Sequence, residues 1–173
     1  MRRKSDKHEK QIVAEMGTAM GEEGRRCPAS GALKWWKGDG YFDGRFRIEV
    51  KETDKSYRTI KLDELKTVAN QAKGLEIPIL VVRFNAKRGD IGEMFVIRKG
   101  NPWKGYNNPP NGPDGTFYSN GFNTSAKQLK IAVEDLRLLC VTLTFRLGTP
   151  EEVTYYVTKW DDFIKEIEND REG

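Results

Sequence analysis

The stretch Gly38–Glu52 reads GDGYFDGRFRIEVKE and predicts two short antiparallel strands joined by a turn at Asp43-Gly44. From Arg45 to Lys51, apolar and charged residues alternate, which is the two-residue period of a strand with one buried face. The side chains expected to face the core are Phe46, Ile48 and Val50, and those expected on the opposite face are Arg45, Arg47, Glu49 and Lys51. The pattern therefore places a carboxylate, Glu49, beside an ammonium group, Lys51.

The length of the turn decides where a second acid, Asp39, points. A two-residue loop would place Asp39 opposite Ile48, on the apolar face. A three-residue loop, Phe42–Gly44, with its glycine in the left-handed conformation, would place Asp39 opposite Arg47 and on the same face as Glu49. We expect the three-residue loop, because it groups the charged side chains and leaves the apolar face dry.

Two carboxylates beside a lysine suit a hard divalent cation. Mg²⁺ takes oxygen ligands and keeps several waters. A bound cation polarises a phosphoryl oxygen and lowers the pKa of a bound water, and a lysine can position that water or stabilise the developing charge. The alternative is an exposed strand on which these side chains form only cross-strand ion pairs.

Several segments together resemble the archaeal-type Holliday junction resolvases of the PD-(D/E)XK nuclease superfamily. Asp39 followed by Glu49-Val50-Lys51 resembles the nuclease core motif, in which an acid and E-x-K lie on adjacent strands. Arg26–Gly31 resembles the R-x-P-A-S-G segment of the resolvases, and His8–Val13 resembles their first helix, in which a glutamate precedes an apolar pair. The resemblance covers roughly residues 5–98. The spacing from Asp39 to Glu49 is shorter than in many members.

The resemblance implies a structure-selective DNA endonuclease that resolves four-way (Holliday) junctions in recombination and repair. It implies Mg²⁺ as cofactor, with Mn²⁺ as a substitute, and a homodimer, since a junction has two symmetric scissile strands. The implied catalytic residues are Glu9, Ser30, Asp39, Glu49 and Lys51, and the implied metal ligands are Glu9, Asp39, Glu49 and the carbonyl of Val50. In this scheme Lys51 orients the attacking water and Ser30 contacts the phosphate. Two alternatives remain open: another PD-(D/E)XK nuclease of repair or restriction type, and a non-catalytic nucleic-acid-binding module.

The first helix is predicted over Ser5–Glu23, with an apolar stripe made of Ile12, Val13, Met16 and Met20. At about 100° per residue, Glu9 falls in the middle of that stripe, where a carboxylate needs a partner. Two roles for Glu9 stay open. It is either a third acid near the metal or a member of a capping box with Asp6.

Net charge is only +4, so binding of a polyanion depends on a local patch of basic residues. The resemblance and the local clustering of charge suggest DNA contacts along the N-terminal tip, beside the serine and after the E-x-K strand. The candidates are Arg2, Arg3, Lys4, Arg25, Arg26, Lys34, Lys37, Lys55 and Arg58. Arginine and lysine contact phosphates without reading sequence.

The composition indicates one α/β domain with an elaboration, intracellular and soluble, in the cytoplasm. The chain has 173 residues, and its two cysteines, Cys27 and Cys140, lack the spacing of a zinc site. No apolar run is long enough to span a membrane, and the N-terminus has no apolar signal segment. We therefore expect no membrane partner.

The fold expected is a restriction-endonuclease-like core, a mixed central sheet flanked by helices, with a C-terminal β-hairpin and helix. The core is assigned to residues 1–100, an Asn/Gly/Pro-rich aromatic insertion to 101–125, and the hairpin and helix to 126–173. After the E-x-K strand we expect a polar loop at 52–59, a helix at 61–75, and strands at 77–85 and 91–98. Further strands are expected at 129–147 and 152–158, followed by a helix at 160–169.

Overall fold

The structure is a computed structural model that describes residues 4–26, 40–42, 44–85, 92–100, 120–138 and 140–172, without the side chains of 4–7 and 25–26. Its helices are α1 (Lys4–Met20), α2 (Leu62–Gln71), α3 (Val133–Leu136) and α4 (Trp160–Glu172). Its strands are β1 (Arg25–Arg26), β2 (Gly40–Phe42), β3 (Phe46–Thr53), β4 (Tyr57–Lys61), β5 (Ile77–Phe84), β6 (Glu93–Arg98), β7 (Asn120–Asn123), β8 (Gln128–Ala132), β9 (Val141–Phe145) and β10 (Val153–Lys159).

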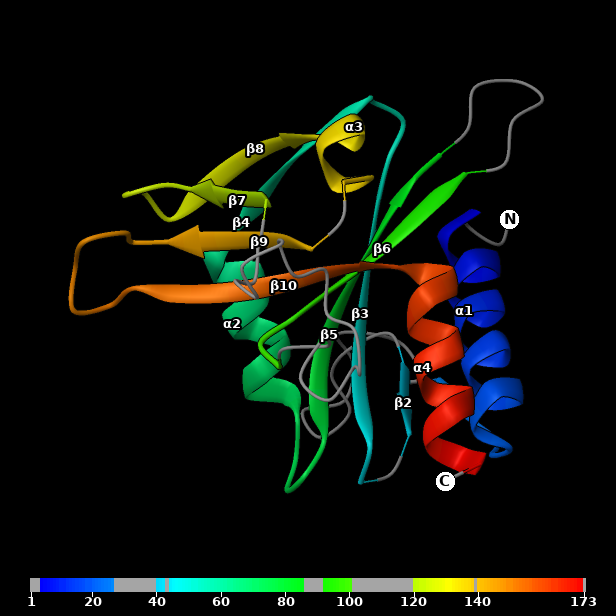
Figure 1. Cartoon of the computed structure of the whole chain (residues 1–173). Helices are drawn as coiled ribbons and strands as arrows, with labels where there is room; N and C mark the ends of the chain where they lie inside the picture. The colour runs from blue at the N-terminus through cyan, green and yellow to red at the C-terminus, as the bar shows by residue number, and fades with distance from the viewer. Residues whose placement is uncertain are drawn as a thin grey trace, which may run out of the picture.

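The architecture is α/β, with a mixed central sheet and flanking helices (Figure 1). Within the described ranges the sheet has eight strands in the order β1-β2-β3-β5-β6-β10-β9-β7. The pairs β3–β5 and β7–β9 are parallel and the other neighbours are antiparallel. A separate two-stranded sheet is formed by β4 and β8. Helix α2 lies in the crossover between the parallel strands β3 and β5, as such a connection requires.

The central sheet is buried on both faces, because the side chains of its inner strands alternate between two apolar clusters. On one face, Ile48, Val50, Ile79 and Val81 pack against α1 and α4, which lie side by side (Figure 1). On the other face, Leu80, Val82 and Phe84 pack against α2 and the inner side of the β4–β8 sheet. Strand β3 therefore presents its even-numbered residues to α1 and its odd-numbered residues to the opposite face.

The predicted helices and the buried strand at 77–85 are confirmed, with changes at their ends. The second helix, expected to extend to residue 75, ends at Gln71, and Leu75 beyond it is 89% exposed. The expected polar loop at 52–59 is wrong in part, because β3 continues to Thr53 and β4 begins at Tyr57. The expected strand at 129–147 is divided into β8, α3 and β9, while the hairpin between β9 and β10 is confirmed.

The β2–β3 turn differs from both expected registers. Phe42 pairs with Phe46 and Gly40 pairs with Ile48, so the loop has three residues, 43–45. The amide of Arg45 donates a hydrogen bond to the carbonyl of Phe42, N···O 3.0 Å, and Gly44 adopts φ 72°. The left-handed glycine was expected, but the loop begins one residue later than predicted.

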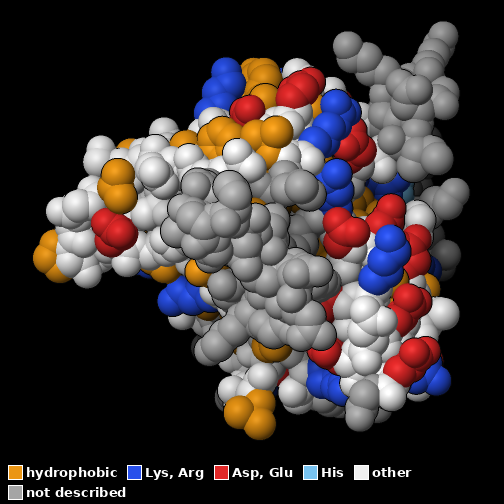
Figure 2. Space-filling model, in the orientation of Figure 1, with side chains coloured by type: hydrophobic (Ala, Val, Ile, Leu, Met, Phe, Trp, Pro, Cys, Tyr) orange, Lys and Arg blue, Asp and Glu red, His pale blue; other side chains and the backbone are white. Residues whose placement is uncertain are grey.

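No helix in the described ranges is long and apolar enough to cross a membrane. Figure 2 shows acidic and basic side chains interspersed over α1 and α4. Where positive and negative side chains are mixed, their electrostatic fields largely cancel. A polyanion would therefore bind at a local patch of basic residues.

Candidate active site on strand β3

Glu49 and Lys51 form a hydrogen-bonded ion pair on β3, with Lys51 Nζ 2.6 Å from Glu49 Oε1. Both side chains point away from the α1 face, because they alternate with Ile48 and Val50. Their side chains are 18% and 35% exposed, respectively. The prediction that these two residues share the face of the strand opposite to Ile48 and Val50 is confirmed.

The next charged residue on this face, Arg47, is buried and plays a structural part. Its guanidinium donates two hydrogen bonds to Glu76, Nε to Oε2 and Nη2 to Oε1, both 3.0 Å. It also lies 4.9 Å from the centre of the Tyr41 ring. The two side chains of the ion pair are each only 4% exposed. Arg47 therefore anchors β3 just before the residues that remain accessible.

Helix α1 brings Glu9 to the same end of β3, on the helix that covers the other face. Its neighbour His8 places Nδ1 at 2.7 Å from Oε1 of Glu52, three residues beyond Glu49 on the strand. Glu9 itself is half-buried, one turn before the fully buried Ile12. This partial burial agrees with the prediction that Glu9 lies on the apolar stripe of the helix. The capping box with Asp6 is wrong, because α1 begins at Lys4 and Asp6 lies within the helix. The role of Glu9 as a third acid beside Glu49 is not supported by this placement, because α1 covers the opposite face of β3.

The donor chemistry at Glu49 fits a hard cation. Its Oε2 atom makes no hydrogen bond within the described part of the chain, so one carboxylate oxygen is available as a ligand. The side chain of Val50 points to α1, between the two charged residues. Among the residues described, no group of three or more His, Cys, Asp or Glu side chains could hold a metal ion. A complete site therefore requires at least one ligand from elsewhere in the chain.

Several predicted site residues lie outside the described residues: Arg2, Arg3, Ser30, Lys34, Lys37 and Asp39, together with the side chains of Lys4, Arg25 and Arg26. The residue that follows Asp39 in the sequence, Gly40, pairs with Ile48, which directly precedes Glu49. The first residue of β2 thus lies opposite the residue of β3 that directly precedes Glu49.

Two of the predicted DNA-contacting residues are described and differ in their surroundings. Lys55 is exposed, with its Nζ 5.4 Å from the centre of the Tyr57 ring. Arg58 is half-buried and donates from Nη2 to Oε1 of Glu64 at 2.9 Å. Lys55 is therefore placed to contact a ligand in solution, whereas the guanidinium of Arg58 is engaged within the protein.

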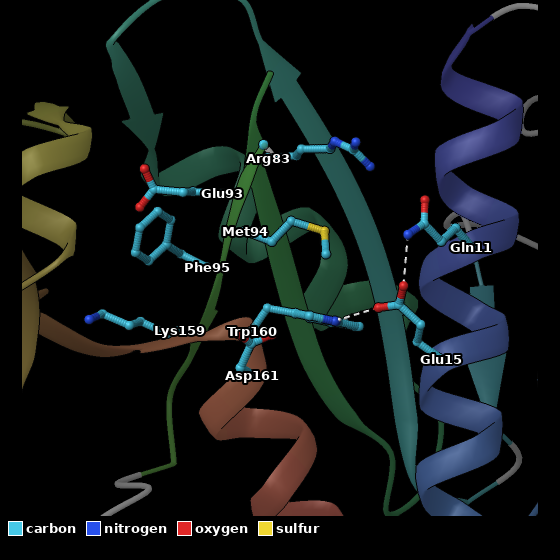
Figure 3. Close-up of a pocket in the computed structure, with 10 residues that line it drawn as sticks. Gln11, Glu15, Arg83, Glu93, Met94, Phe95, Lys159, Trp160 and Asp161 are labelled. Carbon is cyan, nitrogen blue, oxygen red and sulfur yellow. Dashed lines mark hydrogen bonds between the residues drawn. The ribbon is translucent and has the colours of Figure 1, made fainter. Parts of the chain in front are cut away.

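A pocket of about 410 Å³ lies between α1, β5, β6 and the start of α4 (Figure 3). Glu15 accepts hydrogen bonds from Gln11 Nε2 at 2.8 Å and from Trp160 Nε1 at 2.7 Å. Arg83 extends from β5 toward α1, and its buried Nε has no hydrogen-bond partner among the residues that the structure describes. Arg83 pairs in the ladder with Glu52, so this pocket lies across the sheet from Glu49 and Lys51.

The acids of the pocket are largely committed to partners within the protein. Glu93 forms an ion pair with Arg137, and this guanidinium holds the pKa of the Glu93 carboxyl below its usual range. This pocket was not predicted from the sequence. The single signal for it is one arginine, Arg83, within the otherwise apolar run at 77–84.

Comparison with protein-family models, with curated proteins and with solved structures found no match to this chain. The residues themselves and their geometry therefore carry the functional assignment.

Proposed function

We propose that this protein is a metal-dependent, structure-selective DNA endonuclease that resolves four-way junctions by phosphodiester hydrolysis. The observation that carries the proposal is the Glu49–Lys51 pair, joined at 2.6 Å on one face of β3 and partly exposed. A carboxylate with a free oxygen beside a positioned ammonium group is the part of a nuclease site that the E-x-K motif supplies. The substrate that we expect is branched DNA, and the location that we expect for the protein is the cytoplasm.

The arrangement of elements supports the same assignment. Helix α1 precedes the antiparallel β2–β3 pair, and helix α2 then crosses to β5, which is parallel to β3. This is the order of helix, E-x-K hairpin, helix and strand that the resemblance to the PD-(D/E)XK nucleases implies. The alignment of Gly40 with Ile48 supports Asp39 as the second acid, since Asp39 directly precedes Gly40.

In the proposed site each residue has a separate task. Asp39, Glu49 and the carbonyl of Val50 would hold Mg²⁺; Glu9, on the helix that covers the other face of β3, is left out of this set. When bound, the ion supplies charge that polarises a phosphoryl oxygen and lowers the pKa of a coordinated water. Lys51, fixed by its bond to Glu49, orients the attacking water and offers a proton donor to the charge that develops on the phosphate. Ser30 would hydrogen-bond the same phosphate.

A four-way junction contains two symmetric scissile strands, so we propose a twofold homodimer with one site in each protomer. Recognition in this scheme depends on the branch shape and on phosphates, with little reading of bases.

The test offers labelled four-way junction, flap and linear duplex side by side, with Mg²⁺ or with EDTA. We expect cutting of the junction only, and only with the metal. Glu49→Gln and Asp39→Asn should each lower the cleavage rate by at least about 10²-fold, because the transition state loses a stabilising charge. Both variants should still bind the junction in EDTA.

The matched control is Glu168→Gln, which changes an exposed glutamate on α4. This variant should cleave the junction at the wild-type rate.

Each other outcome changes the proposal. A Glu49→Gln variant that still cuts would move the site elsewhere in the chain. Equal cutting of all three substrates indicates a general PD-(D/E)XK nuclease. Junction binding that is unaffected by EDTA, with no cutting under any condition, indicates a nucleic-acid-binding module.

A further inference from the structure

The β4–β8 sheet has one apolar face and one basic face. Its antiparallel pairing places Thr59 opposite Lys130 and Lys61 opposite Gln128. Because side chains alternate across a strand, Ile60 and Ile131 point into the core, where they are 0% and 2% exposed. The outer face and its flanking turns present Lys55, Tyr57, Thr59, Lys61, Lys127, Gln128 and Lys130, which we call the ribbon surface.

Two ammonium groups of the ribbon surface approach one aromatic ring. Lys130 Nζ lies 3.9 Å from the centre of the Tyr57 ring, and Lys55 Nζ lies 5.4 Å from it. The ring face attracts cations, so Tyr57 holds together two lysines that repel each other. Both ammonium groups would attract the anionic oxygens of a ligand that reached this ring.

The four lysines of the ribbon surface form no ion pair within the described part of the chain. Two neighbouring acids are engaged with other residues of the protein. Glu64 accepts from Arg58 at 2.9 Å, and Asp54 accepts from Asn85 at 2.9 Å. The ribbon surface is therefore a patch of one sign on a protein whose net charge is only +4.

We infer that the ribbon surface binds the phosphate backbone of duplex DNA. The inference rests on the proposed function for the choice of DNA, and it names the surface that holds an arm of the junction. Three residues separate the end of β3 from the start of β4, so the ribbon surface continues directly from the strand that carries Glu49 and Lys51. Five residue pairs extend over roughly 17 Å, about the axial length of five base pairs.

The side chains favour a nucleic-acid backbone over a lipid surface. Lysine is a point charge that contacts phosphate without a demand for base sequence. A helix or strand that enters a lipid interface adds large apolar side chains to its lysines, and the ribbon surface has no large aliphatic residue.

The test measures binding of fluorescein-labelled junction and linear duplex by anisotropy, in EDTA, from about 50 to about 200 mM KCl. Each phosphate contact contributes about 0.9 to the slope of log K against log salt. Lys55→Gln combined with Lys130→Gln should therefore lower the slope by about 1.8. Between the lowest and the highest salt concentration, the fold-loss of affinity should be roughly 12 times larger for the wild type than for the variant.

The matched control removes two exposed lysines on the helices α2 and α4, by Lys66→Gln and Lys165→Gln, and should keep the wild-type slope. Circular dichroism checks that both double variants are folded. Tyr57→Leu, which leaves every charge in place, should weaken binding by less than the loss of both lysines. An unchanged slope in the Lys55/Lys130 variant, or an equal loss in the control, would overturn the inference.

Cleavage separates this inference from the proposed function. A wild type that binds DNA through the ribbon lysines and never cuts it would contradict the nuclease and support the ribbon surface. A wild type that cuts the junction while the lysine variant keeps its slope would support the nuclease and overturn the ribbon surface. Binding to anionic vesicles in place of DNA, with the same lysine dependence, also overturns the inference.

Discussion

The buried ion pair of Arg47 and Glu76 fixes the part of β3 that leads to Glu49. Both side chains are 4% exposed, and two hydrogen bonds of 3.0 Å join them. A buried charge without its partner keeps its desolvation cost. Glu76→Gln should therefore lower the free energy of unfolding by about 3–5 kcal/mol, measured by urea denaturation.

Two further variants make this prediction specific to burial. Glu151→Gln breaks the pair with Arg146, in which the glutamate is 61% exposed, and should leave the urea midpoint near that of the wild type. Replacing both buried partners, by Arg47→Met with Glu76→Leu, should recover most of the stability lost in the single variant. A single variant as stable as the Glu151→Gln control would contradict a structural role for this pair.

For single residues, the sequence predicts those features that depend on the alternation of side chains along one strand. Glu49 and Lys51 share a face because a strand has a period of two, and the structure agrees. The burial of Arg47 was not predictable in this way, since its partner Glu76 is 29 residues away. The turn register was not predicted correctly because the sequence pattern does not distinguish a loop at 42–44 from one at 43–45. Moving the loop by one residue changes every cross-strand pair but leaves each side chain on the same face of the sheet.

At the scale of the element, α4 closes one of the two apolar clusters. Its Phe163 is fully buried, edge-to-face with Phe46 at 5.7 Å between ring centres, and lies under Arg98. Phe163→Ala removes a large side chain from a packed interior. It should cost about 3–5 kcal/mol of unfolding free energy. In contrast, Leu138→Ala, at a position 46% exposed, should cost much less; thermal denaturation compares the two.

The short elements were the hardest to predict from sequence. Strand β4 lies in a polar stretch, and its partner β8 follows more than 60 residues later, so no local pattern indicates their pairing. The apolar run at 129–147 predicts one strand, yet Cys140 adopts φ 53°, a left-handed conformation in which a strand cannot continue. The ribbon surface depends on the pairing of β4 with β8 and was therefore not predicted from the sequence. Only Lys55 among its residues was predicted to contact DNA.

For the whole molecule, the two apolar clusters are joined through shared strands. Strand β5 gives Leu80, Val82 and Phe84 to one cluster and Ile79 and Val81 to the other. Strand β6 divides in the same way, with Phe95 and Ile97 on one side and Val96 on the other. Neither cluster can be exposed without breaking a strand that the other requires, so we expect the molecule to unfold as one unit.

This expectation is tested with one cavity in each cluster. Leu65→Ala, beneath α2, and Phe163→Ala, beneath α4, should each move a single urea transition to a lower midpoint. The slope of free energy against urea should stay unchanged, because both variants expose the same total surface on unfolding. Backbone circular dichroism and tryptophan fluorescence should give coincident transitions. Two separated transitions in either variant would show that α1 and α4 form a unit that opens independently of the α2 side.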